Sequence, residues 1–140
     1  MLHIMKLAVG VRDVAHLGAI QSARLALEGR LVHRTRNFPR RAQELLDGGS
    51  IYWVVAGALV VRQRVTDVVE DVLADGRRCA AIVLNPTLVG VAGRPTKPFQ
   101  GWRYLAATDA PADLVAGASA VGEAAMPAAL RRELRDLGLL

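Results

Sequence analysis

Three β-rich segments joined by short turns constrain the fold of this chain more than any other feature of its sequence. Residues 51–56 and 59–69 are rich in β-branched and aromatic side chains and are separated by a glycine turn. Asp75-Gly76 is a hairpin signal, and residues 77–84 provide the returning strand. Hairpin connections of this kind predict an antiparallel sheet and argue against a parallel, doubly wound one.

Helices are predicted to pack around this sheet. The first begins after an N-cap at Asp13, carries an apolar stripe that ends at Leu27, and stops at Gly29. Shorter helices are expected to begin near Asn37 and near Asp109, because both residue types favour the N-cap position.

The chain is expected to form one α+β domain over residues 1–114. Residues 3–9 and 99–105 would be its opening and closing strands. The predicted fold is a small, curved, mostly antiparallel sheet, or a partly closed barrel, with packed helices. Residues 115–140 are expected to form an Ala- and Gly-rich linker followed by a C-terminal helix with arginines on its exposed side.

The basic composition favours an anionic partner. The net charge is +5, and all but two of the 18 basic residues are arginine. Nucleic acid, acidic proteins and anionic lipid are the partners that such a charge attracts. A GC-rich genome would produce the same arginine bias, so both explanations stay open for the total charge.

Several classes of protein are disfavoured by what the sequence lacks. The single cysteine, Cys79, permits no intrachain disulfide and lies in an apolar run typical of a buried position. The three histidines lack metal-ligand spacing, and there is no Gly-rich phosphate loop. No uncharged stretch reaches the ~20 residues of a membrane span. We therefore expect a cytoplasmic protein without cofactor, metal or membrane association, and no catalytic motif is found.

Basic residues form the candidate anion-binding site. Residues 30–41 hold five arginines and no acidic residue, and guanidinium groups match phosphate oxygens in bidentate geometry. The candidates are Arg34, Arg36, Arg40, Arg41, Arg62, Arg64, Lys97 and Arg103. Arg34, Arg36, Arg62, Arg64 and Arg103 are expected to converge on one surface. The alternatives are that the 30–41 run is a solvated loop paired with distant carboxylates, and that Arg62 and Arg64 lie on a solvent-facing side of a strand.

Aromatic and amide side chains next to these cations are candidates for stacking and recognition. They are Tyr52, Trp53, Gln100, Trp102 and Tyr104. Nucleobases stack on such rings in single-strand-binding proteins. Core packing is the alternative, above all for Trp53, and Gln100 is equally well explained by a hydrogen-bonded turn.

Two blocks of residues carry a resemblance to a known family. The first holds His33-Arg34-Thr35-Arg36, Glu44-Leu45-Leu46-Asp47-Gly48-Gly49-Ser50, Tyr52-Trp53-Val54 and Arg62-Gln63-Arg64, and the second is Pro98-Phe99-Gln100-Gly101-Trp102-Arg103-Tyr104-Leu105. Over roughly residues 1–114 the chain resembles the bacterial family called domain of unknown function fourteen-eighty-nine. The activity of that family is not established, so this resemblance implies no reaction.

The order of elements is more distantly similar to the PUA and ASCH superfamily of small barrels. Members of that superfamily often bind RNA or modified nucleic acid, so the likeness implies a nucleic-acid-binding module, RNA before DNA. The alternative is a small-molecule enzyme or a sensor of a nucleotide or phosphate ligand that uses the same pocket, with Arg34, Arg36 and Arg103 holding a phosphate. A protein-interaction domain that uses the arginine-rich tail is a third possibility.

Overall fold

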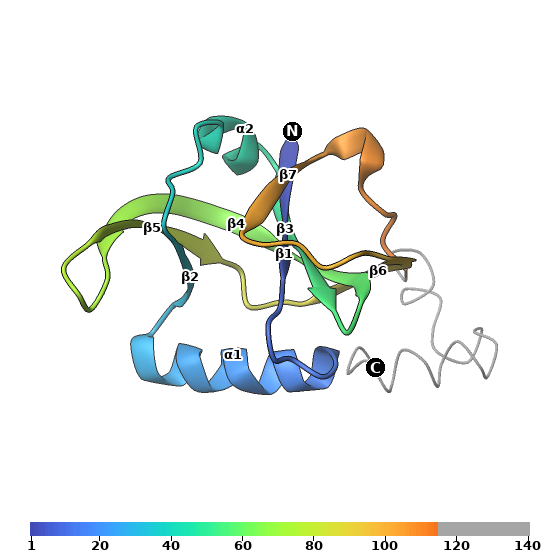
Figure 1. Cartoon of the computed structure of the whole chain (residues 1–140), viewed down its shortest axis with the longest axis horizontal. Helices are drawn as coiled ribbons and strands as arrows, with labels where there is room; N and C mark the ends of the chain where they lie inside the picture. The colour runs from blue at the N-terminus through green and yellow to red at the C-terminus, as the bar shows by residue number, and fades with distance from the viewer. Residues whose placement is uncertain (115–140) are drawn as a thin grey trace.

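The computed structural model of the protein describes residues 1–114, which form an open seven-stranded sheet with two helices (Figure 1). The elements are β1 (Leu2–Leu7), α1 (Val14–Glu28), β2 (Leu31–Thr35), α2 (Ala42–Leu46), β3 (Ser50–Val55), β4 (Ala58–Val72), β5 (Arg78–Leu84), β6 (Val89–Pro95) and β7 (Trp102–Ala106), followed by a 3-10 turn at Ala107–Asp109.

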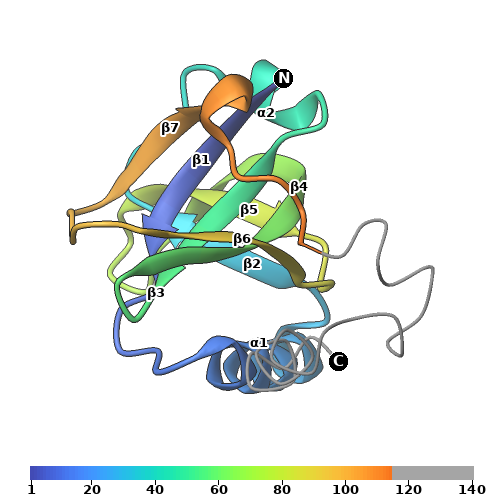
Figure 2. The same cartoon turned by 90° about the vertical axis from the view of Figure 1, so that its right-hand side faces the viewer.

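The strand order is β2-β5-β4-β3-β1-β7, and β6 also pairs with β4. The pairs are antiparallel except β1 with β3, which is parallel. The expected α+β class is confirmed. The sheet is mixed and open, with edges at β2 and β7, and is not a closed barrel. Figure 2 shows β7, β1, β3 and β4 side by side, with α1 lying on one face of the sheet.

Helix α1 has the predicted ends. The Asp13 side chain accepts a hydrogen bond from the His16 N–H at 2.7 Å, and Gly29 closes the helix in the left-handed conformation with φ 78°. The expected burial of Leu27 is wrong, since its side chain is 87% exposed. Buried Val14, Leu17 and Gln21 and half-buried Leu25 form the inward stripe, and Leu27 lies ~200° around the helix from Leu25.

Strand β4 runs through the middle of the sheet and pairs with β3 and β6 along its first half and with β5 along its second. Val61, Gln63 and Val65 are buried on the face that packs against α1, and Arg62 and Arg64 alternate to the other face as predicted. A register shift separates Leu59 from Val61. Leu59 therefore packs in a second core on the opposite face, with Tyr52, Val54, Val91 and Leu105.

Four local predictions differ from the structure. Segments 30–41 and 93–98, in which no strand was predicted, contain β2 and part of β6. The N-cap of α2 is Arg41 instead of Asn37. The helix expected at Asp109 is absent from the described residues, because the chain after the 3-10 turn is extended and lies along β6. There the Ala92 N–H donates to the Ala112 oxygen at 2.8 Å. The predicted C-terminal linker and helix lie outside the described residues.

Candidate functional site

A hollow of about 550 Å³ lies between β2 and β7, the strands at the two ends of the strand order. We call it the edge hollow. Its lining residues are Lys6, Arg34, Thr35, Arg36, Asn37, Gln100, Gly101 and Trp102. They bring together cations, side-chain amides and an indole ring, and there is no carboxylate among the described residues that line the hollow.

The sheet places Lys6 in this hollow. Lys6 is paired with Trp53 on β3 and with Trp102 on β7, and directly opposed residues of neighbouring strands project to the same face. Gly101, with φ 71°, turns the chain into β7 directly before Trp102. The lysine side chain is thus flanked by two indole rings on the face that carries α1.

Tyr104 ties the chain after β2 to β7. Its hydroxyl oxygen accepts a hydrogen bond from the Arg41 N–H at 3.0 Å, and the Arg41 guanidinium lies 5.6 Å from the centre of its ring. The Trp102 ring meets Tyr104 edge-on, with 5.0 Å between ring centres. These contacts hold the segment that contains Arg36 and Asn37 opposite Trp102.

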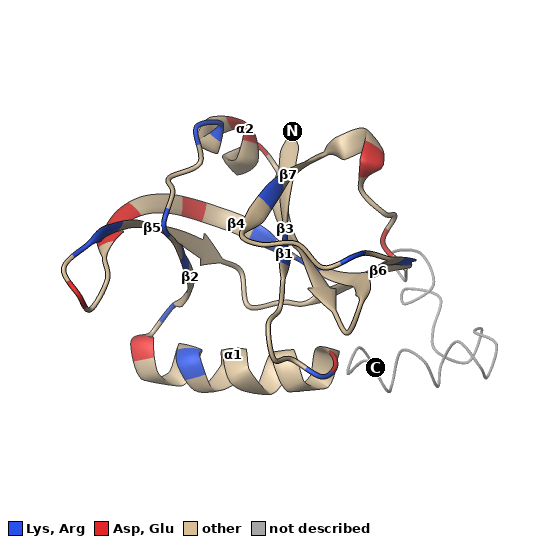
Figure 3. Cartoon of the chain, in the orientation of Figure 1, with Lys and Arg blue, Asp and Glu red and all other residues tan. Residues whose placement is uncertain are grey.

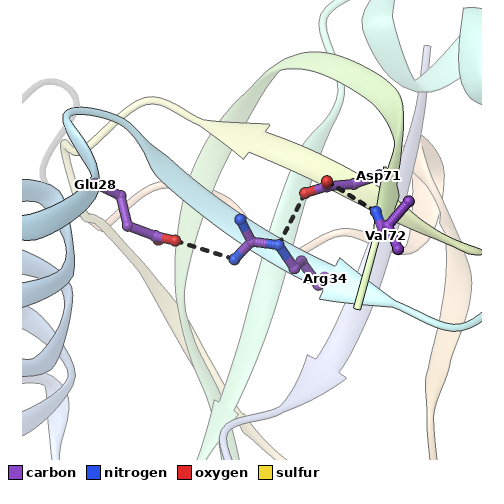
Figure 4. A network of polar contacts seen from close by, with 4 residues as sticks. All are labelled: Glu28, Arg34, Asp71 and Val72. Carbon is purple, nitrogen blue, oxygen red and sulfur yellow. Dashed lines mark hydrogen bonds and ion pairs between the residues drawn. The ribbon is translucent and has the colours of Figure 1, made fainter. Parts of the chain in front are cut away.

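Arg34 lines the edge hollow but is already engaged in ion pairs. Its Nε donates to Asp71 at 2.9 Å and its Nη1 to Glu28 at 3.2 Å (Figure 4). The hydrogen bond from Arg34 to Asp71 raises the pKa of the guanidinium, with a smaller contribution from Glu28. Asp71 also accepts from the Val72 N–H at 2.8 Å, so its position is fixed. The alternative prediction, in which arginines of residues 30–41 pair with distant carboxylates, is therefore correct for Arg34.

Arg41 is paired as well, since its Nη2 donates to Glu44 at 2.7 Å. Lys6 and Arg36 differ from Arg34 and Arg41, because neither forms an ion pair with another residue of the described part. Within residues 1–114 they are the cations of the edge hollow that have no carboxylate partner.

Arg62 and Arg64 line a different hollow, on the other face of the sheet. Arg62 makes a bidentate ion pair with Asp113, with both distances 2.7 Å, and donates to the Ser50 Oγ at 3.1 Å. The ion pair raises the pKa of Arg62 and lowers that of Asp113.

The remaining cations are dispersed too. Arg103 lies over the Phe99 ring, 4.7 Å from its centre, and alternates to the face opposite Trp102. Arg40 and Lys97 are exposed and do not line the edge hollow. Figure 3 shows basic and acidic positions spread over the whole described part. The expected convergence of the arginines on one surface is therefore not observed.

Two of the predicted aromatic residues are core residues. Trp53 is 5% exposed and its Nε1 donates to the Gln63 Oε1 at 2.8 Å. Tyr52 is 4% exposed and packs edge-on against His3. Trp102, Tyr104 and Gln100 are at least partly exposed, and Gln100 and Trp102 line the edge hollow.

Lys6 and Asn37 are the site residues that sequence reasoning missed. Asn37 was interpreted as a helix cap. The sequence pattern around β1 could have indicated Lys6. Side chains of a strand alternate between its two faces, so Lys6 lies on the same inward-facing side as the buried residues Ile4 and Ala8.

The comparison with protein families decides where this chain belongs. Residues 4–140 match the family described as Protein of unknown function (DUF1489). The chain belongs to this family. The DUF1489 match includes residues 115–140. The resemblance to this family that we inferred from sequence motifs extended only to about residue 114. No curated protein and no solved structure matches the chain.

Two further observations limit the chemistry of the described part. Within residues 1–114 no helix is long and apolar enough to cross a bilayer. In the same residues no group of three or more His, Cys, Asp or Glu side chains is arranged to hold a metal ion.

Proposed function

We propose that this DUF1489 protein binds single-stranded nucleic acid, RNA in the first instance, in the edge hollow. The observation that carries the proposal is that Lys6 and Arg36, two cations without a described ion-pair partner, share one hollow with the Trp102 ring. Asn37 and Gln100 add amide groups to the same hollow.

Each group has a defined role in this proposal. Arg36 and Lys6 contact phosphate oxygens and contribute most of the affinity. Trp102 offers a ring face to an unpaired base, and the amides of Asn37 and Gln100 donate to and accept from a base edge. A hollow of about 550 Å³ receives a splayed nucleotide and not a duplex, which favours single strands over double helices.

The wider context supports the same class of partner. The net charge of +5 attracts nucleic acid, and the element order that resembles PUA and ASCH domains is one in which RNA binding is frequent. A bacterial, cytoplasmic protein with this fold and charge would meet RNA in its own compartment. Paired Arg34, Arg41 and Arg62 fix the structure in this proposal and do not contact the strand.

Fluorescence anisotropy with labelled single-stranded RNA, duplex RNA and single-stranded DNA, each at several salt concentrations, tests the proposal. We expect the single strands to bind. Arg36→Gln should reduce the slope of log affinity against log salt by about 0.7, the value of one phosphate contact on a single strand. Arg64→Gln is the matched control, because it removes the same charge from the hollow on the other face.

Trp102→Ala separates stacking from charge in the same assay. It should leave the salt slope unchanged and weaken binding by about 1–3 kcal/mol. If Arg36→Gln and Arg64→Gln have equal effects, the affinity comes from total charge and the edge hollow is not the site.

A small phosphorylated ligand is the second candidate. The observation that favours it is that the hollow holds two available cations, enough for one phosphate group. There is no histidine, cysteine or carboxylate among the described lining residues, which favours a sensor over an enzyme. The small-ligand proposal replaces the RNA proposal if the protein binds no polymer at low salt and a mononucleotide raises its melting temperature.

A further inference from the structure

A second cavity, of about 240 Å³, lies between α1 and the sheet. We call it the helix cavity. Its lining residues are Lys6, Leu7, Ala8, Val9, Val11, Leu17, Ile20, Gln21, Arg24, Leu31, Val32, His33, Trp53 and Leu84. Most of this lining is apolar, and its volume lies just below the ~300–1,000 Å³ of typical small-molecule sites.

The amide groups near this cavity bond to each other. Gln21 and Gln63 exchange two hydrogen bonds of 2.8 Å, and the Gln63 Oε1 also accepts from the Trp53 Nε1. The polar part of this wall is therefore satisfied within the protein and does not require a ligand.

His33 is different. Its Nε2 is buried and has no hydrogen-bond partner among the described residues. Because this nitrogen has almost no accessible surface, it belongs to the wall of the cavity, and a ligand does not reach it. The ring packs edge-on against Trp53 with 5.3 Å between centres, so its orientation is fixed.

The charges around the cavity have one sign. Among the described residues Lys6 and Arg24 line it and no acidic residue does, and neither cation forms an ion pair with another residue of that part. Burial, with contributions from Lys6 and then Arg24, lowers the pKa of His33 to about 4. The imidazole is thus neutral at pH 7 and adds no third charge to the cavity.

We propose that the helix cavity binds a small amphipathic carboxylate. The apolar body of the ligand packs against Leu17, Ile20 and Leu31. Its carboxylate faces Lys6 and Arg24, and the uncharged His33 ring forms part of the cavity wall. A carboxylate on an apolar body matches an apolar cavity that is lined by two cations, and the cavity excludes a polymer by its size. The helix cavity shares Lys6 with the edge hollow, but this inference does not rest on the proposed function.

Isothermal titration calorimetry of the full chain with three probes tests this inference. Hexanoate has both parts of the expected ligand, 1-hexanol has only the apolar body, and acetate has only the charged head. We expect hexanoate to bind at least about tenfold more tightly than either partial probe, because loss of one hydrogen bond to a charged group costs about that factor. Equal binding of hexanoate and 1-hexanol would show a merely apolar void and overturn the proposal.

Variants locate the site. Arg24→Gln changes an exposed side chain and should leave the fold intact while weakening hexanoate about tenfold. Arg64→Gln, on the other face of the sheet, is the matched control and should bind hexanoate as the unchanged protein does. If Arg24→Gln binds hexanoate with unchanged affinity, the carboxylate does not sit in the helix cavity.

Discussion

His33 is the residue in which burial and charge act most strongly together. Its pKa is lowered to about 4 from an ordinary value of 6.5, first by burial and then by Lys6 and Arg24. The folded protein therefore keeps a neutral imidazole at a pH where the unfolded chain already carries a proton on it. A histidine in this state links the stability of the fold to pH.

We expect the free energy of unfolding to fall as the pH falls from about 6.5 to about 4, because in this window the unfolded chain binds a proton at His33 and the folded protein does not. The two pKa values differ by the equivalent of about 3 kcal/mol. Urea unfolding at a series of pH values measures this loss, and His33→Gln should remove it.

His3, a second histidine with a lowered pKa, provides a control for the unfolding experiment. Burial lowers the pKa of His3 too, followed by the charges of Arg62 and the N-terminus. His3→Gln should therefore keep the share of the pH dependence that belongs to His33. A pH slope that is the same in His33→Gln and in the unchanged protein would mean that His33 is already protonated or accessible in the fold.

Helices and strands set by local chemistry were predictable, and those that depend on a distant partner were not. Asp13 and Gly29 end α1 by caps that the sequence contains, and Asp75-Gly76 forms the turn between β4 and β5. Strand β2 was hidden by its charge, because the pairing of Arg34 with Asp71 depends on a residue far away in the sequence. Its pairing with β5, some fifty residues away, leaves no mark in the local pattern.

Gly49, in the turn between α2 and β3, should not tolerate a larger side chain. A Cβ on Gly49 would lie 2.2 Å from the Leu2 oxygen and 2.3 Å from the Leu45 oxygen, so Gly49→Ala must displace the backbone. We expect a loss of about 1–3 kcal/mol or more in the free energy of unfolding. Chemical denaturation measures it.

Gly18 in the middle of α1 is the control for that substitution. A Cβ there would meet the Leu88 Cδ1 at 3.6 Å, an ordinary contact. Gly18→Ala should therefore stabilise the protein by about 0.5–1 kcal/mol, since alanine favours a helix more than glycine does. If Gly18→Ala and Gly49→Ala lower the free energy of unfolding by the same amount, the close backbone contacts at Gly49 are not the reason why that position requires glycine.

At the scale of the whole molecule, sites form where separate segments meet. The edge hollow takes Lys6 from β1, Arg36 and Asn37 from the chain after β2, Gln100 from the chain before β7, and Trp102 from the start of β7. Arg36, Gln100 and Trp102 could be predicted from their residue types. Which arginines are left available could not, because that depends on carboxylates brought close only by the fold.

Lys6 lines both the edge hollow and the helix cavity, so the two proposed ligands should oppose each other. A carboxylate in the helix cavity neutralises Lys6 and removes it as a phosphate contact, so saturating hexanoate should raise the Kd for single-stranded RNA and flatten its salt dependence. By linkage, saturating RNA must raise the Kd for hexanoate by the same factor, which is about 5–150-fold for typical couplings. Anisotropy and calorimetry on the same protein measure the two factors, and Lys6→Gln should abolish both. If neither ligand changes the Kd of the other, the Lys6 ammonium contacts a ligand in only one of the two hollows.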